Sequence, residues 1–556
     1  MIRSVLKHSR LLLFFLFIWL ILLINSVHNS YPDEFDNILG GRFFLQGIWP
    51  YSGYFAHHAP LGYVFSAIIE IFSGQSFVKF RFISSLFFLG VMFLTYRVIR
   101  QKFILFFFFI LAIASTYFWG HMFLADCLSG YLLIPAYGLL FLKMYKDQDL
   151  QTKDLVIISG FTAATMLTST TFMFAVSTVV GLTGIVFLSQ FWRNPKILLK
   201  KIVLSGVIFS LPYILFGTYL LVTGSLKDFL FDNYTYNSKY YIYNYPVVAA
   251  NGINPIRYAI SIINNFINNY QVLLSRVNQI NFMEPFNITL AVGNAALWIY
   301  LAVRKKFWLI PFSFLLLAFA NVRSNPLNSK VTDYQAAVYF FLSFFNFAFL
   351  FETIINDIKD HKDEFVKIVG SFLLIVTGTL WFYTLTFLGA ELWRMSYNRY
   401  MGQMPLIYDR PQVAPIVNQI VDKNSYCWIG PFEFEENFYL NCRRPSKYTW
   451  ILPQYANSPE IQKELLAQYS AKKPDVIVYN RNFSAFFQSS DYNKFFINGF
   501  LDGNYFLLKD VPGFKNARFK TAGTQNFTFA ADFNFRKDIA PELVRKLIQR
   551  GLVEVD

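Results

Sequence analysis

Two adjacent carboxylates, Asp33 and Glu34, stand directly after the first long apolar stretch of the chain. The dipeptide Tyr31-Pro32 precedes them, and a loop leads from them to the turn His57-His58-Ala59-Pro60-Leu61-Gly62. Acidic side chains close to the hydrocarbon of a membrane are costly and are retained mainly where they serve a function. The acidic pair and the turn therefore mark a candidate reactive site.

Asp33 suits general-base chemistry. A carboxylate here can take the proton of an acceptor hydroxyl as that hydroxyl attacks a sugar carbon, if the carboxylate lies on the face opposite the leaving group. A phosphate leaving group departs as a stable anion, so one carboxylate and cations for the phosphate suffice. The structural alternative is that Asp33, followed by Asp36, caps a helix over 34–44.

The composition identifies the class of protein that must position these groups. The chain has 556 residues, of which 55% are hydrophobic and 15% charged, and it contains 66 Phe. Its mean hydropathy is +0.38. A soluble globular protein could not bury so much apolar surface, whereas a bilayer solvates it. We therefore expect a polytopic α-helical membrane protein.

Apolar stretches long enough to cross a bilayer predict about eleven spans, the first being a retained anchor rather than a cleaved signal peptide. Segment 61–73 is too short to cross and is expected to lie along the interface. The predicted spans are 11–28, 80–97, 103–119, 127–142, 155–170, 173–190, 202–221, 286–303, 307–321, 336–351 and 366–389.

Lys and Arg collect in alternate short loops, which orients the chain in a multi-pass cell membrane. The N-terminus is expected in the cytoplasm, with the Asp33 loop and the C-terminal domain outside. This topology explains much of the net charge of +15, so no nucleic-acid partner is needed. The basic loops contain Arg97, Arg100, Lys102, Lys143, Lys146, Lys153, Arg193, Lys196, Lys200, Lys201, Arg304, Lys305, Lys306, Lys359, Lys362 and Lys367.

Hydrophobicity falls after the last predicted span and divides the chain. Residues 1–395 are the predicted membrane domain, and residues 400–556 a predicted extracytoplasmic α/β domain. Strand patterns at 426–430 and 475–479, with helical patterns at 413–421, 458–469 and 541–550, favour a small parallel sheet. Cys427 and Cys442 both fall outside, where a disulfide is permitted, but spacing alone leaves their pairing open.

The loop after the first span resembles the first outer loop of integral-membrane glycosyltransferases. The resemblance is to glycosyltransferase family 39 and the related lipid A aminoarabinose transferases of the GT-C superfamily. It implies a sugar transferred from a polyprenyl phosphate on the outer face, with Asp33 as the catalytic carboxylate and Glu34 as its neighbour. It rests on Pro32-Asp33-Glu34, Gly40-Gly41, Gly47-Ile48-Trp49-Pro50-Tyr51 and His58-Ala59-Pro60-Leu61-Gly62-Tyr63.

A second match to the family is Asp126, which opens the fourth predicted span in the sequence Phe123-Leu124-Ala125-Asp126. Charge-based topology places it on the same side as Asp33, so we expect both in one site. The alternative is that Asp126 caps its own helix.

The chain departs from the family pattern at the turn, where Ala59 replaces a proline and His57 and His58 stand near the family's Lys-Pro position. Neutral His is a weaker phosphate anchor than Lys. The two His, with Glu34 and the aspartates, suggest a divalent metal ion as an alternative, although adjacent His side chains usually point apart.

Cations on the outer side are few. We expect Arg323 and Lys330, between two spans, to hold the lipid phosphate, with Lys239 and Arg257 as further candidates for substrate binding. Interfacial snorkelling explains each of these equally well. A tyrosine run beside Lys239 suits either a sugar ring or the membrane interface. Glu284 and Asp333 are further outer acids next to spans.

The predicted function is a glycosyltransferase that moves a sugar from a polyprenyl-phosphate donor to a lipid-, glycan- or protein-linked acceptor hydroxyl, among membrane lipids. A lipid or sugar transporter or flippase is the main alternative, because it also places acids in a membrane cavity. A non-catalytic assembly or sensor protein would leave Asp33, Glu34 and Asp126 without a role.

Overall fold

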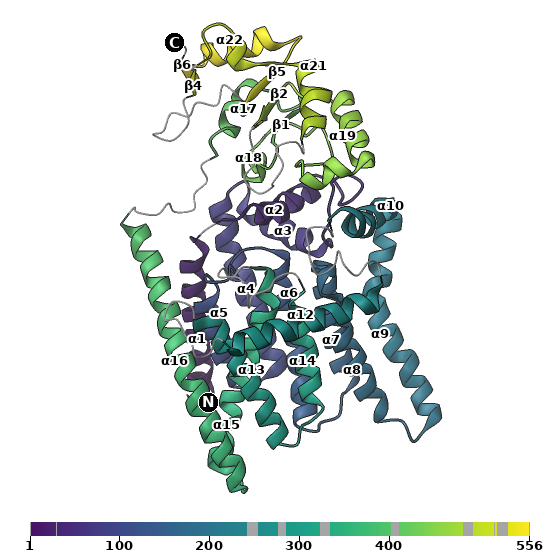
Figure 1. Ribbon diagram of the computed structural model, residues 1–556, viewed down its shortest axis with the longest axis vertical. Helices are drawn as coiled ribbons and strands as arrows, with labels where there is room; N and C mark the ends of the chain where they lie inside the picture. The colour runs from purple at the N-terminus through teal and green to yellow at the C-terminus, as the bar shows by residue number, and fades with distance from the viewer. Residues whose placement is uncertain are drawn as a thin grey trace.

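The computed structural model describes residues 2–28, 30–241, 254–275, 285–322, 334–401, 411–481, 493–515, 517–519 and 532–554. A bundle of long helices forms the lower part of the molecule, and a unit with a small sheet lies on one end of it (Figure 1). Eight helices are long and apolar enough to cross a membrane. The chain is thus a polytopic α-helical membrane protein, as its composition predicted.

Every predicted span coincides with a helix. Eight correspond to the long apolar helices, two to the 12-residue α5 and α14, and one to the 17-residue α7. The helices of this part are α1 (Ile2–Ser26), α2 (Pro32–Leu45), α3 (Leu61–Ser73), α4 (Phe77–Ile99), α5 (Phe103–Ala114), α6 (Ala125–Tyr145), α7 (Thr152–Thr168), α8 (Met173–Ser189), α9 (Pro195–Val222), α10 (Leu226–Leu230), α12 (Pro255–Ser275), α13 (Pro285–Val303), α14 (Leu309–Ala320), α15 (Ala337–Asp360) and α16 (Glu364–Tyr400).

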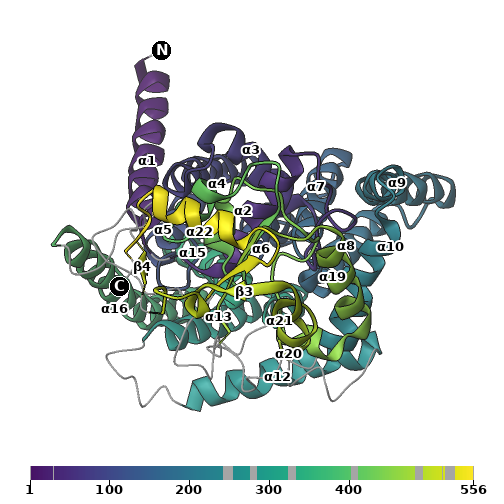
Figure 2. The same ribbon diagram turned by 90° about the horizontal axis from the view of Figure 1, so that it is seen from above.

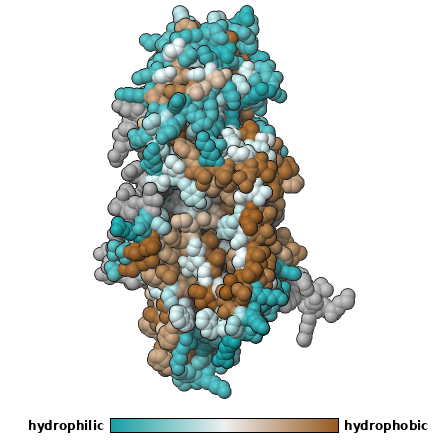
Figure 3. Space-filling view, turned by 90° about the vertical axis from the view of Figure 1, so that its right-hand side faces the viewer, coloured by the Kyte–Doolittle hydropathy of each residue, from teal (hydrophilic) through white to brown (hydrophobic). Residues whose placement is uncertain are grey.

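On the face shown in Figure 3, hydrophobic residues gather over the helical part, between hydrophilic surfaces above and below. Helix α6 lies at the centre of the bundle, because it is buried from Ala125 to Leu142, whereas α9 lies at the edge and has only two buried residues. The exposed residues of α9 include Leu199, Val203 and Ile214. Apolar side chains on an outer helix are what a lipid-facing surface requires.

The basic loops gather at the end of the bundle away from the sheet. Ion pairs join them: Lys143 lies 3.3 Å from Asp154, Arg304 lies 3.3 Å from Asp357, and Lys306 pairs with Asp147. These loops follow α6, α13 and α15. The basic loops that alternate along the sequence thus lie at one end of the molecule.

Helix α2 lies between the bundle and the sheet-containing unit (Figures 1 and 2). Eight consecutive residues from Glu34 to Gly41 are buried, which means that the helix is covered on every side. Helix α3 packs against it, and a Cβ on Gly41 would lie 2.6 Å from the backbone N of Ala67. Glycine therefore sets the close approach of these two helices.

The C-terminal unit contains a four-stranded sheet in the order β1-β2-β5-β3. Strands β1 and β2 are parallel, as predicted, but β5 pairs antiparallel with both β2 and β3, so the sheet is mixed. The strands are β1 (Cys427–Gly430), β2 (Val476–Tyr479), β3 (Tyr505–Leu507) and β5 (Phe533–Arg536), with β4 (Arg518–Phe519) and β6 (Val553–Glu554) forming a second pair.

Helices flank this sheet, and a disulfide closes one of its loops. Three of the helices correspond to the helical patterns of the sequence: α17 (Ala414–Ile420), α19 (Pro459–Ala471) and α22 (Ala540–Gln549). The others are α18 (Phe434–Phe438), α20 (Lys494–Phe496) and α21 (Asp502–Asn504). Cys427 and Cys442 form a disulfide, which settles the pairing that spacing left open.

Candidate functional site

Asp33 lies in the first turn of α2, at the end of the bundle covered by the C-terminal unit. Tyr31 is the N-cap residue and Pro32 takes the first helical position, and no side chain caps the helix. The capping alternative for Asp33 is therefore not what the structure shows. The Asp33 side chain is half-buried, and the Tyr334 hydroxyl donates a hydrogen bond to its Oδ2.

Three aromatic rings from three parts of the chain lie together next to the start of α2, and one of them, Tyr334, contacts Asp33. Tyr31 lies 5.1 Å from Trp119 and 5.4 Å from Tyr334, and the rings of Trp119 and Tyr334 are stacked at 6.1 Å. Tyr334 begins the short helical turn η6 (Tyr334–Ala336) before α15. The ring that holds the carboxylate is thus part of an aromatic group, and flat aromatic faces suit the apolar face of a sugar.

Glu34 has a different setting from Asp33. It is fully buried, forms an ion pair with Arg81, and accepts a hydrogen bond of 2.9 Å from the Phe123 backbone N–H. Burial raises the pKa of Glu34, while Arg81 and the Phe123 N–H act in the opposite direction. The Glu34 carboxylate thus joins α2 to α4 through Arg81 and to the start of α6 through Phe123.

Asp126 lies in the first turn of α6, where it is fully buried. Leu124 is the N-cap residue and no side chain caps this helix either. The Asn37 amide donates to the Phe123 carbonyl at 3.1 Å. Helix α2 therefore binds both the backbone N–H and the backbone carbonyl of Phe123, just before α6. Asp33, in the first turn of α2, and Asp126, in the first turn of α6, therefore lie at the same end of the bundle.

The turn after His58 reaches the same place. A Cβ on Gly62 would lie 3.3 Å from Asn37 Oδ1 and 4.0 Å from a methyl of Leu128. The turn therefore ends between α2 and α6, as expected if loop and span form one site.

Cations that sequence analysis did not select lie behind α2. Arg81 donates to the carbonyls of Ser26 and His28, both at 3.4 Å, and Arg399, at the end of α16, donates to the carbonyl of Val27. Arg81 and Arg399 are 2% and 6% exposed. Both guanidinium groups thus hold the segment that leads from α1 to α2, and Arg81 also pairs with Glu34.

Two histidines complete the cluster. The His121 Nε2 lies 3.1 Å from the His28 carbonyl, and both side chains are buried. Burial and the nearby Arg399 and Arg81 lower the pKa of His28 to about 4, and burial with Arg81 lowers the pKa of His121 as well. Both imidazoles are therefore neutral at physiological pH. The signal that could have found Arg81 is its charge within an apolar predicted span.

His57 and His58 have ring centroids 4.1 Å apart, so these adjacent side chains lie together rather than pointing apart. The preceding peptide is fixed on both sides, because Asp232 accepts from the Ala56 N–H at 3.1 Å and Asn233 donates to the Ala56 carbonyl at 3.2 Å. Sequence analysis missed Asp232 and Asn233. Within the described ranges, no group of three or more His, Cys, Asp or Glu side chains is placed to hold one metal ion.

The remaining predicted cations are dispersed. Lys239 lies 3.6 Å from Glu460 of the C-terminal unit, and both side chains are exposed. Arg257 lies near the start of α12, with its side chain exposed to solvent. Arg323, Lys330, Glu284 and Asp333 lie outside the described residues.

The tyrosine run joins the two parts of the molecule instead of lying along the membrane. Tyr236 is fully buried, with ring centroids 5.0 Å from Phe55 and 6.1 Å from Tyr455, and the Tyr240 hydroxyl donates to Glu460 at 2.7 Å. The membrane-interface interpretation is therefore wrong for these two tyrosines, because the C-terminal unit covers them.

No protein-family model and no curated protein sequence matches this chain. Among solved structures, the chain is similar to the crystal structure of ArnT from Cupriavidus metallidurans bound to undecaprenyl phosphate. The TM-score is 0.43 and the sequence identity 12%, over 86% of this chain and 94% of that one. A likeness at this level leaves the functional argument to the chain's own residues.

Proposed function

We propose that this protein is a membrane glycosyltransferase that moves a sugar from a polyprenyl-phosphate donor to an acceptor hydroxyl. The observation that carries the proposal is the setting of Asp33: a half-buried carboxylate that accepts a hydrogen bond from Tyr334, at an end of the bundle that also contains two buried guanidinium groups. Ionisable groups gathered at one end of a membrane bundle are expected at a reactive site.

Asp33 acts as the general base in this proposal. Its carboxylate takes the proton of the acceptor hydroxyl while the hydroxyl oxygen forms a bond to the anomeric carbon of the sugar. The bond from that carbon to the phosphate oxygen breaks, and polyprenyl phosphate leaves with the electron pair. Attack opposite the leaving group inverts the configuration at the anomeric carbon. The Tyr334 hydroxyl orients the carboxylate through its hydrogen bond.

Arg399 and Arg81 provide positive potential for the phosphate. Arg81 is paired with Glu34, and Arg399, which is 6% exposed, donates to the Val27 carbonyl, so both are buried cations at the covered end of the bundle. Buried charge acts over longer distances than exposed charge because little water screens it. Arg323 and Lys330 remain proposed as further phosphate ligands.

The site is assigned to the outer face of a cell membrane, and the N-terminus to the cytoplasm. Support comes from the basic loops, which cluster at the opposite end of the bundle, as cytoplasmic loops do. Residues 1–395 are assigned to catalysis and residues 400–556 to an extracytoplasmic domain that covers the site and contacts the acceptor.

The test is release of polyprenyl phosphate by the purified full-length protein. Wild type and Asp33→Asn are given a panel of polyprenyl-phosphate sugars, with and without a glycolipid extract that supplies acceptors. We expect acceptor-dependent release from one donor by the wild type, and a loss of roughly 10²- to 10⁴-fold in Asp33→Asn, the usual contribution of a general base.

Asp147→Asn is the control, because Asp147 lies at the opposite end of the bundle. Release by Asp33→Asn at the wild-type rate would refute the role of Asp33. The absence of release from every donor, together with movement of labelled donor across vesicles, would favour a transporter instead.

A further inference from the structure

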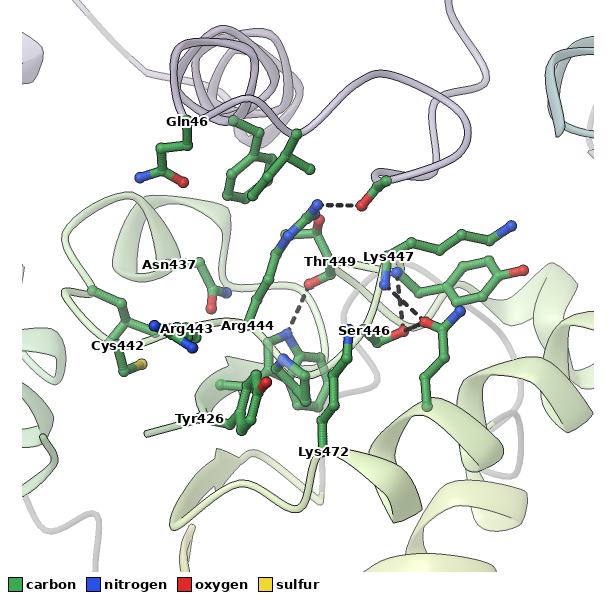
Figure 4. A pocket seen from close by; sticks show the side chains of 18 of the residues that line it. Gln46, Tyr426, Asn437, Cys442, Arg443, Arg444, Ser446, Lys447, Thr449 and Lys472 are labelled. Atoms are coloured by element: carbon green, nitrogen blue, oxygen red, sulfur yellow. Dashed lines mark hydrogen bonds between the residues drawn. The ribbon is translucent and has the colours of Figure 1, made fainter. Parts of the chain in front are cut away.

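A cavity of about 740 Å³ lies where the C-terminal unit meets the loop after α2. Its walls come from Arg42 to Gly53 on one side and from the segments around Tyr426, Arg443 and Lys472 on the other. Figure 4 shows the Arg444 side chain crossing the cavity and Lys472 extending into it from its helix. The volume is within the range of small-molecule binding sites.

The lining of this cavity is strongly basic. It contains Arg42, Arg443, Arg444, Lys447 and Lys472 and, among the described residues that line it, no Asp or Glu. Lys447 is compensated, since it lies 3.1 Å from Asp228 and 3.0 Å from Glu464. The other four cations form no ion pair in the part of the chain that the structure describes.

Arg444 is the most enclosed of these four cations. Its guanidinium stacks 3.9 Å above the Phe43 ring and donates to the Gly53 carbonyl, and its Nη1 is buried without a hydrogen-bond partner among the described residues. Burial lowers the pKa of Arg444 to about 10, so the side chain still carries its charge at neutral pH. An enclosed cation with no countercharge is destabilising unless an anion binds beside it.

The remaining lining residues suit a polyhydroxylated ligand. Gln46, Asn437 and Asn441 offer amide donors and acceptors, and the exposed ring of Trp49 and the half-buried ring of Tyr426 offer flat apolar faces. Amide groups match sugar hydroxyls, and aromatic faces match the C–H face of a sugar ring.

We propose that this cavity binds an anionic sugar, one that carries a phosphate or a carboxylate, through Arg443, Arg444 and Lys472. Guanidinium groups bind both anions with paired hydrogen bonds. The inference rests on the proposed function in one respect only, namely that the anionic sugar is part of the acceptor.

The cavity is separate from the reactive carboxylate. Arg42 follows Asp33 by nine residues in α2, which places the cavity about 14 Å along the helix axis from Asp33. A ligand that fills the cavity and also reaches Asp33 is therefore longer than one sugar. The acceptor implied is an anionic oligosaccharide or glycolipid held at a distance from its reacting hydroxyl.

Calorimetric titration of the full-length protein with glucose 6-phosphate, glucuronate and glucose tests the proposal without any transfer reaction. We expect either anionic sugar to bind at least 10-fold more tightly than glucose, and inorganic phosphate to compete with glucose 6-phosphate. The double variant Arg443→Gln/Lys472→Gln, which changes two exposed residues, should weaken anionic binding at least 10-fold. Arg545→Gln/Arg550→Gln is the control, because it makes the same charge change at exposed positions that do not line the cavity.

Equal binding of the anionic sugars and glucose, or equal binding by the wild type and Arg443→Gln/Lys472→Gln, would overturn the proposal. If the double variant unfolds, competition by inorganic phosphate on the wild type decides the question. Asp33→Asn is titrated as well: unchanged binding by this variant supports a cavity independent of the reactive carboxylate. A failure of binding is thereby separated from a failure of the proposed transfer.

Discussion

The two ends of the helical bundle hold their charges in opposite ways. At the end away from the sheet, each of the three ion pairs described above has at least one partly exposed partner, as in Lys306 with Asp147, which are 21% and 79% exposed. At the covered end, Glu34 and Arg81 are 0% and 2% exposed, and Asp126, His28 and His121 are buried beside them. The charges at the first end thus follow from the membrane topology. Burial of the charges at the second end costs solvation free energy.

This difference in exposure shows at which end of the bundle charged side chains can contribute most to ligand binding. Exposed pairs contribute little because water and salt screen them. Buried charges act strongly on a bound anion or on a developing charge. The C-terminal unit produces this contrast, because it covers α2 on the side that the bundle leaves open.

Breaking the buried ion pair between Arg81 and Glu34 should have the largest effect on the free energy of unfolding. Arg81→Gln leaves the Glu34 carboxylate without its cation, which costs about 3–5 kcal/mol for a buried pair. Arg304→Gln at the other end removes a partly exposed pair and should cost about 1 kcal/mol or less. Thermal unfolding of both variants in one detergent measures the difference. Equal shifts would contradict the contrast, and adding Glu34→Gln to Arg81→Gln should recover part of the loss.

Arg399→Gln tests whether a buried cation at the covered end binds the phosphate of the donor. Loss of one charged hydrogen bond to a phosphate is worth about 1.5–3 kcal/mol, or roughly 10- to 100-fold in affinity. We expect the KM for the lipid-linked donor to rise by this factor with a smaller change in kcat. Arg394→Gln, on the same helix but exposed and paired with Glu391, is the matched control. A rise in KM of the same size in both variants would remove Arg399 from the phosphate site.

Much of this arrangement could be predicted from the sequence. The apolar stretches located all eight described helices that are long and apolar enough to cross a membrane, because a bilayer demands about twenty apolar residues in a row and this signal is local. Asp33 and Asp126 could be assigned to the same side from loop charges alone. The sequence also predicted β1 and β2, whose four residues are all buried.

The partners of the acids could not be predicted. Arg81 and Arg399 approach residues 26–28 from positions more than fifty and more than three hundred residues away, and no spacing rule connects them. Asp232 and Asn233 hold Ala56 across about 175 residues in the same way. Strands β3 and β5 are three and four residues long, too short for an alternating pattern to appear.

A pH dependence should follow from Asp36, one turn beyond Asp33. Burial raises the pKa of Asp36 to about 8, a hydrogen bond from Tyr54 opposes the shift, and the nearby Asp33 adds to it. Between pH 4 and 8 the unfolded chain has lost this proton while the folded chain keeps it, so stability falls as pH rises. The slope is at most about 1.4 kcal/mol per pH unit.

Asp36→Asn tests this dependence, since its amide oxygen can still accept the 2.8 Å hydrogen bond from Tyr54. The stability of Asp36→Asn relative to the wild type should be greater at pH 8 than at pH 6. Thermal unfolding of both proteins at both pH values measures this difference. Other acids titrate equally in both proteins, so the difference isolates Asp36. Parallel pH profiles would show that this carboxyl is already ionised in the folded protein.

The smallest effect is expected at the opposite end. Lys306→Gln removes the partner of the largely exposed Asp147, and a pair of this kind contributes about 0–1 kcal/mol, less in high salt. Unfolding temperature and polyprenyl-phosphate release should both stay close to wild type. A loss of several kcal/mol here, or a loss of release, would mean that the two ends are coupled through the bundle. Helix α6 is buried from Ala125 to Leu142 and α15 from Ala337 to Leu350, so these are the helices that would transmit such coupling.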